Sequence, residues 1–144
     1  MKLLILNGPN LNLLGTRERE IYGEDNLDDI LSGLKSRFPE IQIEHFQSNV
    51  EGELINALHE ASGKGYAGIV FNPGGYTHTS VAIADALAAI TVPAVEVHIS
   101  NLYSREGFRQ ISLTAPHAIG VIQGMGVAVY ALAILYFRDL YNAG

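Results

Sequence analysis

The chain has no cysteine among its 144 residues. Disulfide bonds, thiolate zinc sites and cysteine nucleophiles are therefore excluded. A chain without cysteine suits a reducing compartment, and its first residues run directly into an apolar strand without a signal sequence, so we expect a cytoplasmic protein. It also lacks any run of about 18 apolar residues, the length that a membrane-spanning helix needs. No association with a membrane is therefore expected.

Positive charge is scarce as well. The 9 lysine and arginine residues are outnumbered by 15 aspartate and glutamate residues, which gives a net charge of −6 at pH 7. This balance argues against a general nucleic-acid partner, which selects a basic surface. It does not exclude an anionic substrate, because a local cluster of arginines can outweigh the net charge of the chain.

Signatures of metal and nucleotide sites are missing too. No two histidines have the spacing of metal ligands and the carboxylates are scattered, so no metal is expected. Residues 124–129 read GMGVAV, with Val129 where a dinucleotide fingerprint has its third glycine, so this segment does not predict a dinucleotide site. A phosphate-accepting regulator domain of the same topology needs acidic residues after strands one and three, where Asn7 and Asn72 stand.

What the chain does have is a regular alternation of short apolar runs and amphipathic segments. Amphipathic helices between strands indicate a parallel sheet that is covered on both faces. The sequence therefore predicts a single domain over residues 1–144, a flavodoxin-like three-layer α/β fold with a five-stranded parallel sheet in the order 2-1-3-4-5. The expected strands are 2–6, 41–46, 68–71, 94–97 and 117–122, and the expected last helix is 127–141.

Three of the expected helices carry capping residues at their starts. Asn26 can cap the first helix, which has acidic residues in its first turn. Ser48 and Glu51 have the spacing of a capping box for the next helix. Thr79 or Ser80 can cap the helix that follows the third strand.

Residues 68–87, GIVFNPGGYTHTSVAIADAL, combine a strand, a glycine turn, a polar cluster and a helix. In an open α/β sheet, ligands bind just outside the carboxyl ends of the strands. The pair Gly74 and Gly75 lets the backbone come close to a ligand. The pattern suits a binding site, and it suits equally a loop whose glycines serve only the turn and whose hydroxyls serve only the cap.

Three polar segments are expected to meet at this edge of the sheet, namely 7–22, 72–80 and 96–109. The first contains Arg17 and Tyr22. A positive charge near a tyrosine favours its phenolate form, and a phenolate is a good base for a carbon-bound proton. The alternative for this pair is a surface arginine beside a packed tyrosine.

The third segment contains a candidate acid and a candidate carboxylate clamp. Glu96 and His98 are two apart on a strand and so point to one face, where the carboxylate stabilises the charged form of the histidine. Arg105 and Arg109 are expected on one face of a short helix, and either can grip a carboxylate by two parallel bonds. A structural histidine and a solvated helix face are the alternatives.

An ordered set of motifs resembles the type II 3-dehydroquinate dehydratases over almost the whole chain. The motifs are LNGPNLNLLGTRE, the Tyr22–Gly23 pair, QSNVEGELI, NPGGYTHTS followed by Asp85, EVHISN and REGFR. The resemblance implies conversion of 3-dehydroquinate to 3-dehydroshikimate and water in the shikimate pathway. It also implies an anti elimination through an enolate, with no metal and no organic cofactor.

The resemblance further implies roles for single residues. Tyr22 is expected to take the proton beside the ketone, and Arg17 is expected to keep Tyr22 ionised. His98 is expected to protonate the departing hydroxyl, held in orientation by Glu96, while Asn10 matches the family asparagine near the enolate. The expected substrate-binding residues are Asn72, His78, Asp85, Ile99, Ser100, Arg105 and Arg109.

Family members have a mobile lid, which residues 15–23 match, and assemble as homododecamers. The competing hypothesis is a non-catalytic domain of the same fold that binds a small carboxylated or phosphorylated ligand. The pair Arg17 and Tyr22 argues against it, because a simple binder needs no base. The three lysines of the chain are all expected far from the site, which argues against a Schiff base of the kind that the unrelated type I enzymes form.

Overall fold

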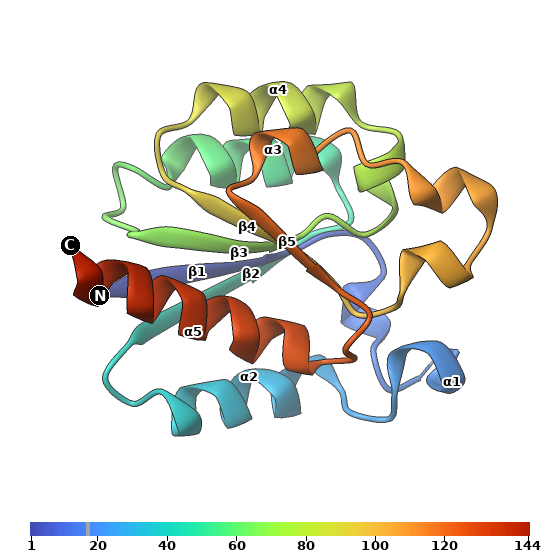
Figure 1. Ribbon diagram of the computed structural model, residues 1–144, viewed down its shortest axis with the longest axis horizontal. Helices are drawn as coiled ribbons and strands as arrows, with labels where there is room; N and C mark the ends of the chain where they lie inside the picture. The colour runs from blue at the N-terminus through green and yellow to red at the C-terminus, as the bar shows by residue number, and fades with distance from the viewer. Residues whose placement is uncertain (17) are drawn as a thin grey trace.

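A computed structural model describes residues 1–16 and 18–144 and contains one five-stranded sheet, in which every pair of neighbouring strands is parallel. The order β2-β1-β3-β4-β5 confirms the predicted topology. Figure 1 shows the sheet as the middle of three layers, the arrangement expected of a flavodoxin-like fold. The strands are β1 (Lys2–Asn7), β2 (Gln42–Gln47), β3 (Gly68–Asn72), β4 (Ala94–His98) and β5 (Gly120–Gln123).

Helices cover both faces of the sheet. One face is covered by α2 (Leu27–Arg37) and α5 (Ala128–Ala143), and the other by α3 (Glu51–Glu60) and α4 (Val81–Ala89) (Figure 1). A four-residue helix, α1 (Arg19–Tyr22), lies apart from these layers. None of the helices in the described part of the chain is long and apolar enough to cross a membrane.

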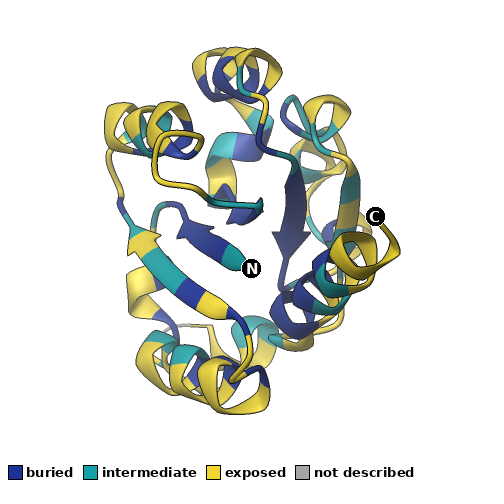
Figure 2. Cartoon of the chain, turned by 90° about the vertical axis from the view of Figure 1, so that its left-hand side faces the viewer, coloured by how far each residue is buried: buried dark blue, intermediate teal, exposed yellow. Residues whose placement is uncertain are grey.

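Alternate residues of the inner strands feed two separate hydrophobic cores. Leu3 and Ile5 of β1 pack with α2 and α5, whereas Leu4 and Leu6 pack with α3 and α4. Successive strand residues point to opposite faces, so a strand with a helix layer on each side is apolar throughout. Figure 2 shows the result as dark blue inner strands inside helices whose outer faces are yellow. Burying each such side chain contributes about 1.5–3 kcal/mol.

Two of the predicted helix caps form and one does not. The side chain of Asn26 accepts from the Asp29 amide at 2.8 Å, and that of Ser80 accepts from Ile83 at 2.9 Å. The capping box of Ser48 and Glu51 was a wrong prediction, because α3 starts two residues later, with an N-cap whose side chain makes no cap bond. Ser48 instead donates to Glu53, and Glu51 accepts from Ser80.

The fifth strand is shorter than predicted. Residues 115–117 form a 3-10 turn, and the ladder with β4 begins only at Gly120. Pro116 stands at the start of that turn, where its fixed φ is favourable and its missing amide hydrogen costs nothing. The apolar run in the sequence therefore begins before the strand does.

The loops that follow β1 and β3 approach each other closely at the carboxyl edge of the sheet. The Gly8 amide donates to the Asn72 carbonyl at 2.7 Å. A Cβ atom at Gly8 would lie 2.4 Å from the Pro73 carbonyl oxygen, so only glycine fits there without displacing the backbone. This contact fixes the two loops against each other beside the site described next.

Candidate active site

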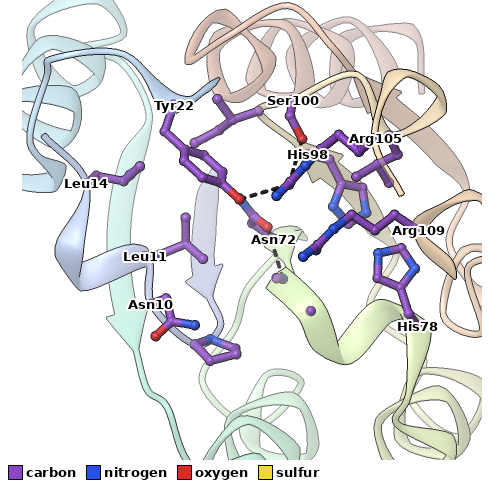
Figure 3. A pocket seen from close by; sticks show the side chains of 15 residues that line it. Asn10, Leu11, Leu14, Tyr22, Asn72, His78, His98, Ser100, Arg105 and Arg109 are labelled. Carbon is purple, nitrogen blue, oxygen red and sulfur yellow. Dashed lines mark hydrogen bonds between the residues drawn. The ribbon is translucent and has the colours of Figure 1, made fainter. Parts of the chain in front are cut away.

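A cavity of about 170 Å³ opens at the carboxyl ends of β1, β3 and β4. Its walls come from the three polar segments that the sequence predicted to meet, and Figure 3 shows side chains from all three converging on it. Nine of the predicted site residues line the cavity, namely Asn10, Tyr22, Asn72, His78, His98, Ile99, Ser100, Arg105 and Arg109. Arg17 lies outside the described residues.

Tyr22 faces the cavity from the last position of α1 (Figure 3). Arg105 Nη1 donates to the Tyr22 phenol oxygen at 2.9 Å and to Ser100 Oγ at 3.2 Å. In the described part of the chain, the buried Nε of Arg105 has no hydrogen-bond partner. Arg105 therefore holds a positive charge against the phenol oxygen.

The two arginines of the third segment do not share a helix, which corrects the expectation from their spacing. Arg105 follows the 3-10 turn Leu102–Ser104, and Arg109 belongs to a second turn, Gly107–Gln110. Arg105 and Glu106 both have extended backbone angles, which separate the two turns. Both arginine side chains nevertheless reach the cavity, and Arg109 Nε is held by Glu106 at 2.5 Å.

Glu96 and His98 lie on one face of β4 as predicted, and both are almost completely buried, with exposed fractions of 2% and 5%. His98 Nε2 lies 2.9 Å from Glu96 Oε2. A carboxylate only accepts, so Nε2 carries the hydrogen and Nδ1 is the ring nitrogen left for a ligand in the cavity. The strand thus fixes which nitrogen of His98 can act.

Three hydroxyl groups surround the Glu96 carboxylate, and sequence reasoning missed them. Thr77 and Ser112 donate to Oε2 at 3.2 and 3.0 Å, and Thr114 donates to Oε1. Burial alone would raise the pKa of Glu96, but the bond and charge of His98 and the hydroxyls of Thr114 and Ser112 bring the pKa below its ordinary value. The clustering of serine and threonine in the segments around 77 and 112–114 was the only signal for this ring.

The ring of His78 is oriented by a backbone carbonyl. Its Nδ1 lies 2.7 Å from the Ile111 carbonyl oxygen, which can only accept. Nδ1 therefore carries a hydrogen, and in the neutral ring Nε2 is an acceptor. Burial lowers the pKa of His78, an effect that the bond to Ile111 opposes in part. Phe108 lies edge-on to the ring with centroids 6.3 Å apart.

The remaining predicted residues fall into two groups. Asn72 ends β3, and its side-chain oxygen accepts from the Gly74 backbone amide at 3.1 Å. Asn10 has a left-handed φ of 69°, and its backbone amide donates to the side-chain oxygen of Asn49 at 2.9 Å. Asp85, in contrast, is exposed on α4 and does not line the cavity of its own chain. The structure therefore does not bring Asp85 to the other site residues.

Residues that could bind a metal are not gathered here. Among residues 1–16 and 18–144, no group of three or more histidine, aspartate and glutamate side chains is placed to hold a metal ion. The arrangement in the cavity is instead a tyrosine beside an arginine, facing a histidine on a carboxylate. Such a pair of groups can remove a proton at one side of a ligand and supply one at the other.

Comparisons with known proteins agree on one family. The family model "Dehydroquinase class II" matches residues 1–138. A 3-dehydroquinate dehydratase of Fusobacterium nucleatum is 51% identical, with 99% of each chain covered, and one of Geotalea daltonii is 53% identical, with 99% of this chain and 97% of that one covered. The crystal structure of a type II dehydroquinase from Butyrivibrio crossotus has a TM-score of 0.93 at 46% identity, covering 96% of this chain and 97% of that one.

Proposed function

The chain belongs to the class II dehydroquinases, and from that premise we propose how its own residues divide the reaction. The reaction is the dehydration of 3-dehydroquinate, a hydro-lyase step of the shikimate pathway. A non-catalytic binding domain is not favoured, because close relatives over the full length are named as dehydratases. What remains to be assigned is which side chain performs which step.

Tyr22 is the base of this proposal. The observation that carries it is the bond of 2.9 Å from the Arg105 guanidinium to the phenol oxygen. A cation that donates to this oxygen stabilises the negative charge that makes it basic. Tyr22 then removes the proton from the carbon beside the ketone and leaves an enolate, with Arg17 as a second cation and Asn10 near the enolate oxygen.

His98 is the acid. Its Nε2 is occupied by Glu96, so Nδ1 donates the proton to the departing hydroxyl. The carboxylate of Glu96 fixes the tautomer and stabilises positive charge on the ring before the proton is given up. Tyr22 and His98 line the same cavity from different elements, and we assign their two proton transfers to different sides of the substrate, as an anti elimination requires.

The other lining residues bind the substrate. Arg109 provides charge-assisted bonds to the carboxylate, together with the amides of Ile99 and Ser100. Asn72, His78 and Arg105 serve the hydroxyl groups and the ketone. Each has a polar atom that its own contacts leave available.

Asp85 needs a second copy of the chain. It is exposed on α4 and outside the cavity of its own chain, so it can take part in binding only at the site of a neighbouring copy. We assign it that role in a homododecamer. Exposed apolar side chains on α5, among them Leu140 and Tyr141, suit burial between copies.

The enolate forms without a covalent link to the protein. A Schiff base needs a lysine in the site, and none of the three lysines lines the cavity. Lys2 bonds to the Lys64 carbonyl at 2.7 Å near the amino end of β1, and Lys35 is exposed on α2. Borohydride added with the substrate is therefore expected to leave the mass of the protein unchanged.

The test of this assignment is Tyr22→Phe, followed by the ultraviolet absorbance of the conjugated enone product. Loss of a general base lowers turnover by roughly 10²–10⁴-fold, with substrate binding largely kept. Tyr103→Phe is the matched control, because Tyr103 is an exposed tyrosine of a neighbouring turn that does not line the cavity. If Tyr22→Phe keeps about a tenth of the wild-type turnover or more, another group is the base.

A further inference from the structure

A continuous chain of hydrogen-bonded side chains runs through the protein interior to the floor of the cavity. It links β2, β1, α5 and β3 through His45, Asn7, Tyr130 and Asn72. His45 Nε2 lies 3.1 Å from Asn7 Nδ2, and Asn7 Oδ1 lies 2.6 Å from the Tyr130 hydroxyl. The Tyr130 hydroxyl lies 3.1 Å from Asn72 Nδ2, and Asn72 Oδ1 lies 3.1 Å from the Gly74 amide.

The direction of every bond in this chain follows from one backbone group. The Gly74 amide can only donate, so the Asn72 atom that faces it must be the oxygen. The Asn72 nitrogen then faces Tyr130 and can only donate to it. The hydroxyl of Tyr130 accepts from Asn72, and its single hydrogen is left for Asn7.

The same reasoning extends to the far end of the chain. Asn7 accepts from Tyr130 with its oxygen, so its nitrogen faces His45 and donates to Nε2. His45 must therefore be neutral, with its hydrogen on Nδ1. Burial, the largest effect on this residue, lowers the pKa of His45 and so favours the neutral ring.

We propose that Tyr130 is a positioning residue, which fixes the side-chain amide of Asn72 so that the pocket meets an N–H donor at that point. The proposal rests on the proposed function, because Asn72 is a substrate-binding residue there. One hydrogen of Asn72 Nδ2 is used by Tyr130, and the second is available to a substrate oxygen. Asn72 thus selects a hydroxyl or carbonyl oxygen and disfavours a donor.

Burial gives this chain its rigidity. Tyr130 is 1% exposed, and Asn7 and Asn72 are also buried, so water cannot replace a lost partner. Turning the Asn72 amide over would set its nitrogen against the Gly74 amide and its oxygen against a hydroxyl whose hydrogen is already used. Each buried donor or acceptor left unpaired costs about 1–3 kcal/mol, which holds the amide in one orientation.

Tyr130→Phe removes the hydroxyl and keeps the ring in the core. Asn72 is then held only by the Gly74 amide, and the Michaelis constant is expected to rise by about 3- to 10-fold, the value of one hydrogen bond. Turnover should change little, because the bond is made equally in the bound substrate and in the transition state. The matched control is Tyr136→Phe on the same helix, an exposed tyrosine outside the chain, which should leave both constants unchanged.

A double substitution distinguishes positioning from a general effect on folding. If Tyr130 acts through Asn72, then adding Tyr130→Phe to an Asn72→Ala enzyme changes the Michaelis constant by less than about twofold. The same rise in both backgrounds, or no rise in the wild-type background, would overturn the proposal. The wild-type enzyme is assayed beside the variants, so failure of the proposed function itself would be seen separately as an absence of enone product.

A measurement on the unmodified protein covers the case in which Tyr130→Phe does not fold. Nitrogen-15 chemical shifts of the imidazole report which ring nitrogen carries the hydrogen. We expect His45 at neutral pH to carry it on Nδ1, with Nε2 as an acceptor. A hydrogen on Nε2 would reverse the Asn7 bond and overturn the direction of the whole chain.

Discussion

Two buried polar networks flank the candidate site, and they are built differently. Around Glu96 the network converges, with His98, Thr77, Ser112 and Thr114 all directed at one carboxylate. Around Tyr130 the network is linear, with one bond between each member and the next. The first network carries a charge, whereas every member of the second is neutral.

The difference shows what each architecture protects. A buried carboxylate needs several donors to offset the loss of water, and a set of donors that all serve one acceptor tolerates the loss of any single donor. A linear chain has no such reserve, because each side chain is oriented only by its neighbour. In such a chain the orientation of one side-chain amide determines the orientation of the next, from Asn72 to His45.

The largest expected effect comes from removing the catalytic end of the converging network. His98→Ala is expected to lower turnover by roughly 10²–10⁴-fold, because hydroxide is a poor leaving group without a proton donor. The steady-state rate of enone formation measures this. His117→Ala, at an exposed histidine outside the cavity, is the control. An unchanged rate in His98→Ala would move the acid to another residue, with His78 the next candidate.

Glu96→Gln should have a smaller effect on turnover than His98→Ala. The amide keeps the shape of the side chain, and its oxygen can still accept from His98, but the negative charge that stabilises the imidazolium is lost. We expect a turnover between those of the wild type and His98→Ala. If Glu96→Gln is as inactive as His98→Ala, then the carboxylate does more than orient the ring.

The charged network should also make folding sensitive to acid. The folded-state pKa of Glu96 lies below its ordinary value of 4.5, so Glu96 stabilises the fold above about that pH and loses this contribution as the pH falls through the folded pKa. Urea unfolding of the wild type from pH 7 to pH 3 should show the loss. Glu96→Gln should show a weaker dependence on pH, and equal slopes for the two proteins would contradict the assignment.

The smallest expected effect is that of Ser112→Ala. Glu96 keeps three other donors in this variant, so turnover and the Michaelis constant should stay within about twofold of the wild type. Ser112 Oγ also accepts from the Ala115 amide at 2.9 Å and contacts the hydroxyls of Thr77 and Thr114. The free energy of unfolding should therefore fall by more than the roughly 0.5–1.5 kcal/mol that one hydrogen bond contributes. Compared with Tyr130→Phe, this variant tests directly whether a converging network is more tolerant than a linear one.

Much of the fold could be predicted because its signals are local. Apolar runs of strand length predicted the strands, and the spacing of Glu96 and His98 placed both on one strand face. The order of the strands was assumed from the flavodoxin-like fold that the alternation of strands and helices suggested. Long-range partners carry no such signal. Arg105 and Tyr22 are separated by 83 positions in the sequence. Their spacing led instead to the pairs Arg17 with Tyr22 and Arg105 with Arg109. The candidate base, the candidate acid and the arginines could be named from the residues, whereas their roles and the remaining site residues came only from the resemblance to a family.

Tyr130 shows a second limit of sequence reading. It sits in an apolar helix at core spacing, where a tyrosine reads as a packing residue, and the helix indeed packs in the core. Only the structure brings its hydroxyl between two asparagines at the ends of different strands. The Ser48–Glu51 capping box failed for a related reason, since tertiary partners took both side chains.

The linear chain also has a consequence for proton traffic. It extends from His45, which lines a groove along β2, to the floor of the cavity. Two of its members are the side-chain amides of Asn7 and Asn72, and a neutral amide does not pass its hydrogens on to a neighbour. The chain therefore insulates the cavity from that groove. Under the proposed assignment Tyr22 ends each cycle with an extra proton and His98 ends it with one too few. That proton must cross the cavity to His98 or leave through the mouth of the cavity before the next turnover, so the enzyme is reset from the substrate side of the site and not through its interior.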